Sequence, residues 1–307
     1  MTGPAHVHSA SGTERRLFWA MVLTAGFMFA EAAGAVFAGS LALLADAGHM
    51  LADGASLALA WLAFRAAHRP SDPRRSYGYA RLQVLAAFAH GVVLVLLSLW
   101  IVVEAGLRLA EPRTIVGGLM LGVAAAGLLV NVVAFAVLHG GDRRNLNVQG
   151  AIIHVLGDLL SSVGAVGAAV VILLTGWTPI DPLLSIAVAL VIARVALKLL
   201  ARSAHVLLEG TPEGFDVDGL KDALRTGVPG LLDVHHVHLW ALTAEHPLLT
   251  LHARVAANAD RDAALAGVHA VLGQRYGIDH ATVQLESGPC PDEAAEDRAN
   301  AAGTAHG

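Results

Sequence analysis

Two histidine–aspartate pairs with the same spacing lie within long apolar segments of this sequence. His49 and Asp53 form the first pair, His154 and Asp158 form the second, and each pair reads His-x-x-x-Asp. Residues four positions apart lie on the same face of a helix, one turn above each other. Two such helices can therefore present two imidazole nitrogens and two carboxylate oxygens to a common point, a tetrahedral donor set that suits zinc.

The apolar surroundings of these pairs favour a functional site. An aspartate in a hydrocarbon layer costs about 3 kcal/mol on insertion scales and usually marks an ion pathway. The alternative is that the four side chains only join helices through hydrogen bonds. A zinc ion held by two neutral imidazoles and two carboxylates has no net charge, and once it leaves, carboxylate repulsion and the histidines favour proton uptake. We therefore predict that the same four residues carry both metal and protons.

The composition is typical of a membrane protein. Of the 307 residues, 55% are hydrophobic and 15% are charged, whereas about 25% are charged in an average soluble domain. The single cysteine, Cys290, excludes an internal disulfide and a cysteine-only metal site. The first apolar run follows a polar segment and lacks a small-residue cleavage site, so we expect an uncleaved spanning helix.

Six apolar segments reach the length of about 20 residues that a helix needs to cross a bilayer. They are expected at residues 17–37, 41–64, 82–107, 115–138, 151–174 and 182–200. Arginine and lysine are concentrated before the first segment, in the second and fourth connections, and after the sixth segment. By the positive-inside rule, both termini are expected in the cytoplasm.

A small soluble domain is expected after the sixth segment. Helical patterns and strand patterns alternate there in the order αββαβ, which predicts an α+β domain with helices on one face of a sheet. The chain is therefore expected to divide into a tail (1–16), a transmembrane transport domain (17–208), a terminal domain (211–287) and a disordered tail (288–307).

Five stretches of sequence point to one family. They are SLALLADAGHMLADGASL, NLNVQGAIIHVLGDLLSSVG, Asp181-Pro182, VHHVHLWALT and HATVQLE. Together they resemble the cation diffusion facilitator family, and most of all its bacterial zinc efflux members, from about Phe18 to Glu286. The resemblance implies a homodimer with a ferredoxin-like cytoplasmic domain, located in the bacterial cytoplasmic (inner) membrane. It also implies export of zinc from the cytoplasm in exchange for protons, with no nucleic-acid partner and no organic cofactor.

The resemblance further implies a regulatory zinc site in the terminal domain. Its ligands, carried over by position, would be His235, His252, His280 and Glu286, with His269 available to a second site. The alternative is a polar sheet surface that binds no metal.

Strand geometry does not fully agree with that ligand set. If Thr243 pairs with Pro247 across the turn, His238 lies opposite His252, and alternation turns His235 to the other face of the sheet. A β-bulge or a shifted register would reverse this prediction.

Other polar residues receive different interpretations. Asp46, three positions before His49, is expected either to accept a hydrogen bond from that imidazole or to lie at the cavity mouth. His90 is interpreted as a packing histidine, and Asp181 as the cap of the sixth helix. Some family members have a histidine-built metal site in the second connection. Here Arg75 and Tyr79 stand at those histidine positions, so no such site is expected.

Three classes of function remain to be distinguished. We favour a zinc–proton antiporter, with cadmium and cobalt as further candidate substrates because they share similar geometry. A metal-gated sensor or channel without pumping is the alternative. A membrane enzyme is not expected, because the sequence has no His-Glu-x-x-His motif with an open zinc position.

Overall fold

A computed structural model describes residues 7–139, 146–243, 246–288 and 290 of the chain. The described residues form two compact units. The first comprises residues up to 62 together with 86–201, and the second comprises 63–85 together with the residues from 202 onward. The predicted tail at 288–307 lies almost entirely outside the described residues, as do the arginines of the fourth connection.

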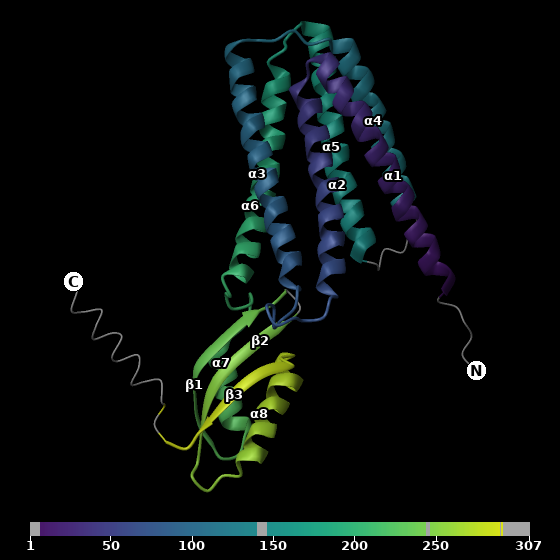
Figure 1. Ribbon diagram of the computed structural model, residues 1–307. Helices are drawn as coiled ribbons and strands as arrows, with labels where there is room; N and C mark the ends of the chain where they lie inside the picture. Colours follow the sequence, from purple (N-terminus) through teal and green to yellow (C-terminus); the bar gives the residue numbers. More distant parts are fainter. Residues whose placement is uncertain (1–6, 140–145, 244–245, 289, 291–307) are drawn as a thin grey trace, which may run out of the picture. The chain divides into compact units, whose positions relative to one another are not determined.

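Six long helices precede the terminal domain (Figure 1). They are α1 (Val7–Ala38), α2 (Leu41–Ala67), α3 (Arg81–Ala110), α4 (Gly117–His139), α5 (Leu146–Thr175) and α6 (Ile180–Leu207). Within the described part of the chain, α2 to α6 contain segments long and apolar enough to cross a membrane, and α1 contributes the shorter apolar segment Val22–Ala38. Helix α1 begins ten residues before the expected apolar span, because the preceding polar segment is also helical.

Helix α2 packs in two apolar clusters of the first unit. On one side its Leu43 joins small and apolar residues of α1, α4 and α5, including Ala35, Met120 and Ala169. On another side its Leu41 joins residues of α3 and α6, including Ile101. The helix that carries His49 and Asp53 is therefore packed against helices of both groups (Figure 1).

The start of α2 is held by a carboxylate from another helix. Asp181, at the first turn of α6, accepts hydrogen bonds from Ser40 Oγ (2.5 Å), Leu41 N (2.8 Å) and Ala42 N (3.2 Å). Asp181 is fully buried and Ser40 nearly so. The interpretation of Asp181 as the cap of its own helix was wrong, because its side chain instead satisfies the free N–H groups at the start of α2.

The turn before α2 is tight. Gly39 has φ 73°, a left-handed conformation that favours glycine. A Cβ at this position would lie 2.9 Å from the Thr114 carbonyl oxygen. Arg108 donates to the Gly39 carbonyl at 2.7 Å and also to Glu104. The connection between α1 and α2 is thereby fixed to the end of α3.

Replacing Asp181 tests the contribution of this interhelical cap. In Asp181→Ala, three buried donors lose their acceptor, and each unsatisfied donor costs about 1–3 kcal/mol. We expect the free energy of unfolding of the detergent-solubilised protein to fall by about 3 kcal/mol or more. Asp181→Asn, which keeps one acceptor oxygen, should lose less. The exposed Glu111→Gln serves as the charge-matched control, and an equal loss in that variant would contradict the interpretation.

The second unit contains the terminal α+β domain, with the predicted order of elements. They are α7 (Val217–Gly227), β1 (Leu231–Ala241), β2 (Pro247–Val255), α8 (Arg261–Tyr276) and β3 (His280–Glu286). The sheet order is β1-β2-β3, with β1 and β2 antiparallel and β2 and β3 parallel. Each helix starts at an aspartate cap, Asp216 or Asp260, as expected from the preference of this residue for that position.

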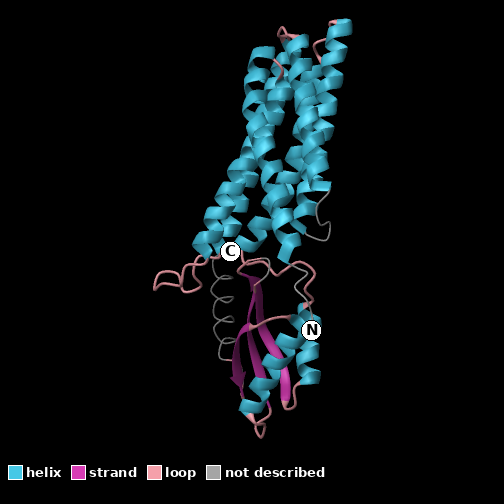
Figure 2. Ribbon diagram, turned by 90° about the vertical axis from the view of Figure 1, so that its right-hand side faces the viewer, coloured by secondary structure: helices cyan, strands magenta, loops and turns pink. Residues whose placement is uncertain are grey.

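The helices cover one face of this sheet (Figure 2). Alternate residues of β2, such as Leu249 and Leu251, are buried against Leu224 of α7 and Leu272 of α8. Side chains alternate between the two faces of a strand. His252 therefore projects from the face that the helices leave open.

A β-bulge in β1 decides the register of its histidines. His235 pairs with His252 and His238 pairs with Thr250, with a register shift between the two pairs. His236, within the bulge, has φ 45°. The prediction that His238 lies opposite His252 was wrong, because Ala241 and not Thr243 pairs with Pro247. The bulge then adds one residue to β1, which reverses the alternation beyond it and brings His235 opposite His252.

Candidate metal centres

The two histidine–aspartate pairs of the first unit meet at one carboxylate oxygen. Asp53 Oδ2 lies 3.6 Å from His49 Nε2 on its own helix and 3.5 Å from His154 Nδ1 on α5. On α5, His154 Nε2 lies 3.6 Å from Asp158 Oδ2. Zinc bound at about 2.0–2.1 Å in a tetrahedron separates its ligand atoms by about 3.4 Å. The spacing of these nitrogen–oxygen pairs is therefore close to what the metal requires.

Three of the four residues already present donor atoms within one small volume. One donor atom each from His49, Asp53 and His154 lies within 4.8 Å of the others. Asp158 lies near Nε2 of His154, the ring nitrogen that does not face Asp53. A tetrahedral site that included Asp158 would require the imidazole of His154 to rotate, because one of its nitrogens faces each aspartate.

Exposure differs across the four side chains. The Asp158 side chain is 4% exposed and that of His154 is 46% exposed, with Asp53 at 20% and His49 at 22%. Asp158 therefore lies on the closed side of the cluster and His154 on its open side.

A further histidine, from α3, joins the cluster. His90 Nε2 lies 3.5 Å from Asp53 Oδ1, the carboxylate oxygen that does not face His49 and His154. The interpretation of His90 as a packing residue therefore missed its main contact. Residue spacing predicts contacts within one helix but not between α2 and α3. Only the packing of the two helices could therefore reveal the contact between His90 and Asp53.

Asp46 does not accept a hydrogen bond from His49 Nδ1, as one expectation required. It is buried and hydrogen-bonded to Glu31 of α1 and Ser161 of α5. The Nδ1 atom of His49 is buried and has no hydrogen-bond partner among the described residues. Asp46 thus joins three helices beside the cluster and does not orient the His49 ring in this structure.

Substitution of His90 tests whether it supports the cluster through Asp53. Loss of a residue that holds a metal ligand typically lowers metal affinity 10–100-fold. We expect His90→Leu to weaken zinc binding by about that factor, measured by equilibrium binding to the purified full chain. His90→Gln keeps a side-chain donor and should lose less. Equal affinities in the wild type and His90→Leu would restore the packing interpretation.

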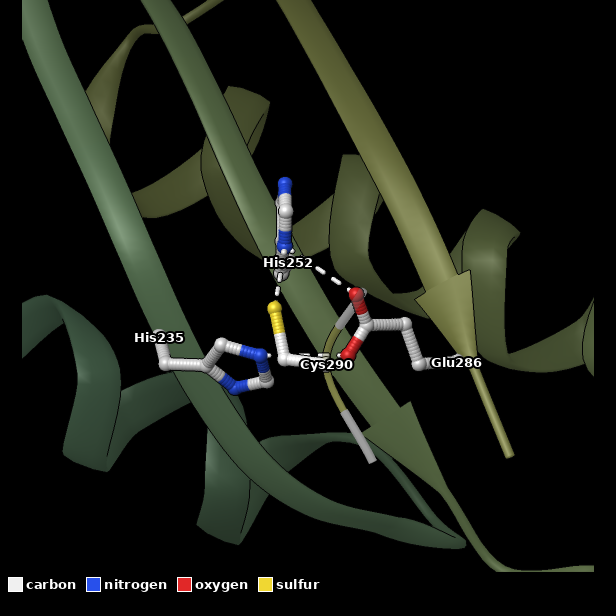
Figure 3. Close-up of side chains that lie close together, drawn as sticks. All are labelled: His235, His252, Glu286 and Cys290. Carbon is white, nitrogen blue, oxygen red and sulfur yellow. Dashed lines mark hydrogen bonds and ion pairs between the residues drawn. The ribbon is translucent and has the colours of Figure 1, made fainter. Parts of the chain in front are cut away.

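A second cluster lies on the open face of the terminal sheet (Figure 3). His235 Nε2 lies 3.1 Å from Glu286 Oε2, and His252 Nδ1 lies 3.0 Å from Glu286 Oε1. Cys290 Sγ lies 3.3 Å from His252 Nδ1. Donor atoms of these four residues lie within 4.8 Å of one another, which suits a tetrahedral N₂OS zinc site.

The electrostatics of this cluster favour a metal cation. Burial raises the pKa of Glu286. Hydrogen bonds from Gln284 and Cys290, and then the neighbouring histidines, lower it by more, so the pKa lies below its usual range. The carboxylate is therefore ionised at neutral pH. His235 also contacts Asp233 through Nδ1 at 3.1 Å, which leaves Nε2 to face the cluster.

His280 does not belong to this cluster. It pairs with Leu248 at one end of β3, whereas Glu286 pairs with Arg254 at the other end. Six residues along a strand correspond to about 20 Å, so His280 and Glu286 cannot bind one ion within the same domain. Its assignment as a ligand was therefore wrong for a site within one protomer.

Cys290 takes the place that His280 was expected to fill. Its sequence signal was weak: it is the single cysteine of the chain, four residues beyond Glu286 and outside any strand pattern. His269, the residue suggested for a second site, lies exposed on α8, away from this cluster.

Cobalt can report whether Cys290 binds metal. A thiolate bound to Co²⁺ gives an intense near-ultraviolet charge-transfer band, and the chain has only this cysteine. We expect the band when Co²⁺ is added to the wild-type full chain, and its complete loss in Cys290→Ser. His280→Ala should keep the band. A wild-type protein that binds cobalt without the band would exclude Cys290 as a ligand.

Comparisons with known proteins place these clusters in a family context. The family model described as the cation efflux transmembrane domain matches residues 17–208, and the model described as the cation efflux protein cytoplasmic domain matches residues 212–288.

Three curated relatives are similar over almost the whole chain. "Zinc transporter ZitB" of Pectobacterium atrosepticum is 48% identical, covering 94% of this chain and 90% of the relative. "Zinc transporter ZitB" of Escherichia coli is 47% identical, covering 93% and 94%. "Cadmium, cobalt and zinc/H(+)-K(+) antiporter" of Bacillus subtilis is 38% identical, covering 92% of each.

Proposed function

Because the chain belongs to the cation efflux family, we propose that it exports zinc from the cytoplasm in exchange for protons. The observation that carries the proposal is the junction at Asp53. There, a carboxylate of α2 contacts histidines of both α2 and α5 in the middle of an apolar helix unit. The names of the relatives support zinc as the substrate, and that of the Bacillus relative supports cadmium and cobalt as further candidates.

The chemistry of the cluster accounts for exchange. His49, Asp53, His154 and Asp158 offer two neutral nitrogens and two carboxylates, so one bound Zn²⁺ leaves no net charge in the hydrocarbon layer. Metal and protons bind the same lone pairs and therefore compete for them. Entry of protons from one side promotes release of zinc there, and deprotonation on the other side restores the site. Alternating access couples the two fluxes.

The donor set supports a transporter over an enzyme. Catalytic zinc usually keeps one coordination position for water or substrate, whereas rotation of the His154 ring would let this cluster offer four protein donors from two helices. A metal-gated sensor or channel remains the second candidate. Because a four-donor site holds its ion too firmly for free conduction, pumping accounts better for the cluster.

The terminal cluster is proposed as the regulatory site. Zinc bound by His235, His252, Glu286 and Cys290 would fix Cys290 to the open sheet face, and through this change would shift the equilibrium between conformations of the transporter. The proposal includes a homodimer in the bacterial inner membrane, with both termini in the cytoplasm. The arginine distribution supports this orientation.

Flux through reconstituted protein tests the transport site. In proteoliposomes with an imposed pH gradient, zinc uptake should follow the gradient for the wild type and fall at least tenfold, to near background, for Asp158→Ala. The reason is that removing one ligand leaves the metal bound by three donors and leaves the set with a net positive charge. Asp218→Asn, an exposed residue of the terminal domain, is the matched control. If the rate of zinc uptake by the wild type is saturable but does not change with the pH gradient, the result would favour the sensor or channel.

A further inference from the structure

A cleft of about 410 Å³ lies within the second unit, between the α2–α3 connection and the first strand of the terminal domain. Its lining combines basic, aromatic and apolar side chains. The lining residues used below are Arg74, Arg75, Tyr77, Arg81, Leu82, Leu85, Leu207, Glu209 and Trp240. The volume falls in the range of roughly 300–1,000 Å³ that is usual for small-molecule sites.

The charge of the lining is positive. It contains three arginines, Arg74, Arg75 and Arg81, against one acidic residue, Glu209. Glu209 is engaged by Arg81, whose Nη2 donates to it at 2.9 Å. The Nε of Arg81 is buried and has no hydrogen-bond partner among the described residues. Within that part of the chain, no hydrogen bond or ion pair neutralises the Arg74 side chain either. The Arg74 guanidinium and the exposed part of the Arg81 guanidinium, whose side chain is 35% exposed, therefore have donors available to an anion.

The connection that carries these arginines has its own hydrogen-bond network. Tyr79 Oη donates to Asp72 at 2.7 Å, and Arg75 donates to Tyr79 Oη at 3.2 Å. The backbone N–H groups of Arg74 and Arg75 also donate to Asp72. The hydrogen bond from Tyr79 and those from the backbone lower the pKa of Asp72. This carboxylate also interacts electrostatically with Arg75, so the positive charge that the cleft can offer to a ligand comes from Arg74 and Arg81.

The other side chains of the lining place the cleft at the boundary between membrane and water. Arg81 and Leu207 are the terminal residues of α3 and α6, both long and apolar enough to span a bilayer. Leu82 and Leu85 continue from Arg81 into α3, and Leu85 is half exposed. Tyr77 and Trp240 add the aromatic side chains that are typical of this boundary.

We propose that this cleft binds the headgroup of an anionic phospholipid. The phosphate would lie against the guanidinium groups of Arg74 and Arg81, and an acyl chain would follow Leu82 and Leu85 along α3. Basic pockets beside spanning helices are suited to such headgroups. A lipid bound here would connect the α2–α3 connection to β1, so that membrane composition would act on the terminal domain. The proposal needs only the membrane setting and does not depend on metal transport.

Native mass spectrometry of the full chain in detergent tests this site, with phosphatidylglycerol as the probe. The wild type should retain phosphatidylglycerol in preference to phosphatidylcholine. Arg74→Gln should weaken that binding about fivefold, the factor expected for one basic residue near an anionic lipid. Arg69→Gln removes the same charge from the same connection outside the cleft lining, and its binding should stay at the wild-type value.

Three outcomes would overturn the proposal. Equal weakening in Arg69→Gln and Arg74→Gln would mean attraction by general surface charge and no specific site. Unchanged binding in Arg74→Gln, together with unchanged binding in Arg81→Gln, would exclude the cleft. Inorganic phosphate that displaces the lipid at similar concentration would show a site for a small anion and not for a lipid. A matching unfolding temperature of wild type and variants would confirm that the comparison concerns folded protein.

Discussion

A charged or polar side chain in a hydrocarbon layer must find its partner on another helix, and the first unit of this protein is organised by that requirement. Asp53 on α2 is reached by His154 from α5 and His90 from α3. Asn131 on α4 donates to Ser162 on α5 at 3.1 Å. Because lipid offers no competing hydrogen bonds, each such pair fixes the position of two helices as well as satisfying two polar groups.

Helix α2 depends most on these contacts. Its first turn is capped by Asp181 of α6, its middle carries His49 and Asp53, and its apolar residues pack in clusters with two groups of helices. A change in the relation of α5 to α3 would therefore act on Asp53 directly. Such a dependence suits the proposed alternating access, because the proposed metal ligands come from two different helices.

The terminal domain does not depend on such interhelical polar contacts, since water can satisfy its polar groups. Its core is an ordinary layer of Leu224, Leu249 and Leu272 between helices and sheet. The cluster on the other face is assembled by a local irregularity. The bulge at His236 brings His235 opposite His252, and the end of β3 then supplies Glu286 between them. With Ala241 paired to Pro247, a regular strand would have placed His236 there and turned His235 to the helix side.

The sequence by itself determined the six-helix and αββαβ organisation, because apolar length, strand alternation and helix caps are local properties. It also predicted that His49, Asp53, His154 and Asp158 form one site, since a histidine and a carboxylate four residues apart in an apolar helix rarely serve packing alone, and the structure brings these side chains near one another. Tertiary structure alone decided the contact of His90 with Asp53, the capping of α2 by Asp181, and the exchange of His280 for Cys290. Each of these contacts joins segments that no periodicity relates, or depends on one extra residue in a strand. They become visible only when the helices and strands are packed together.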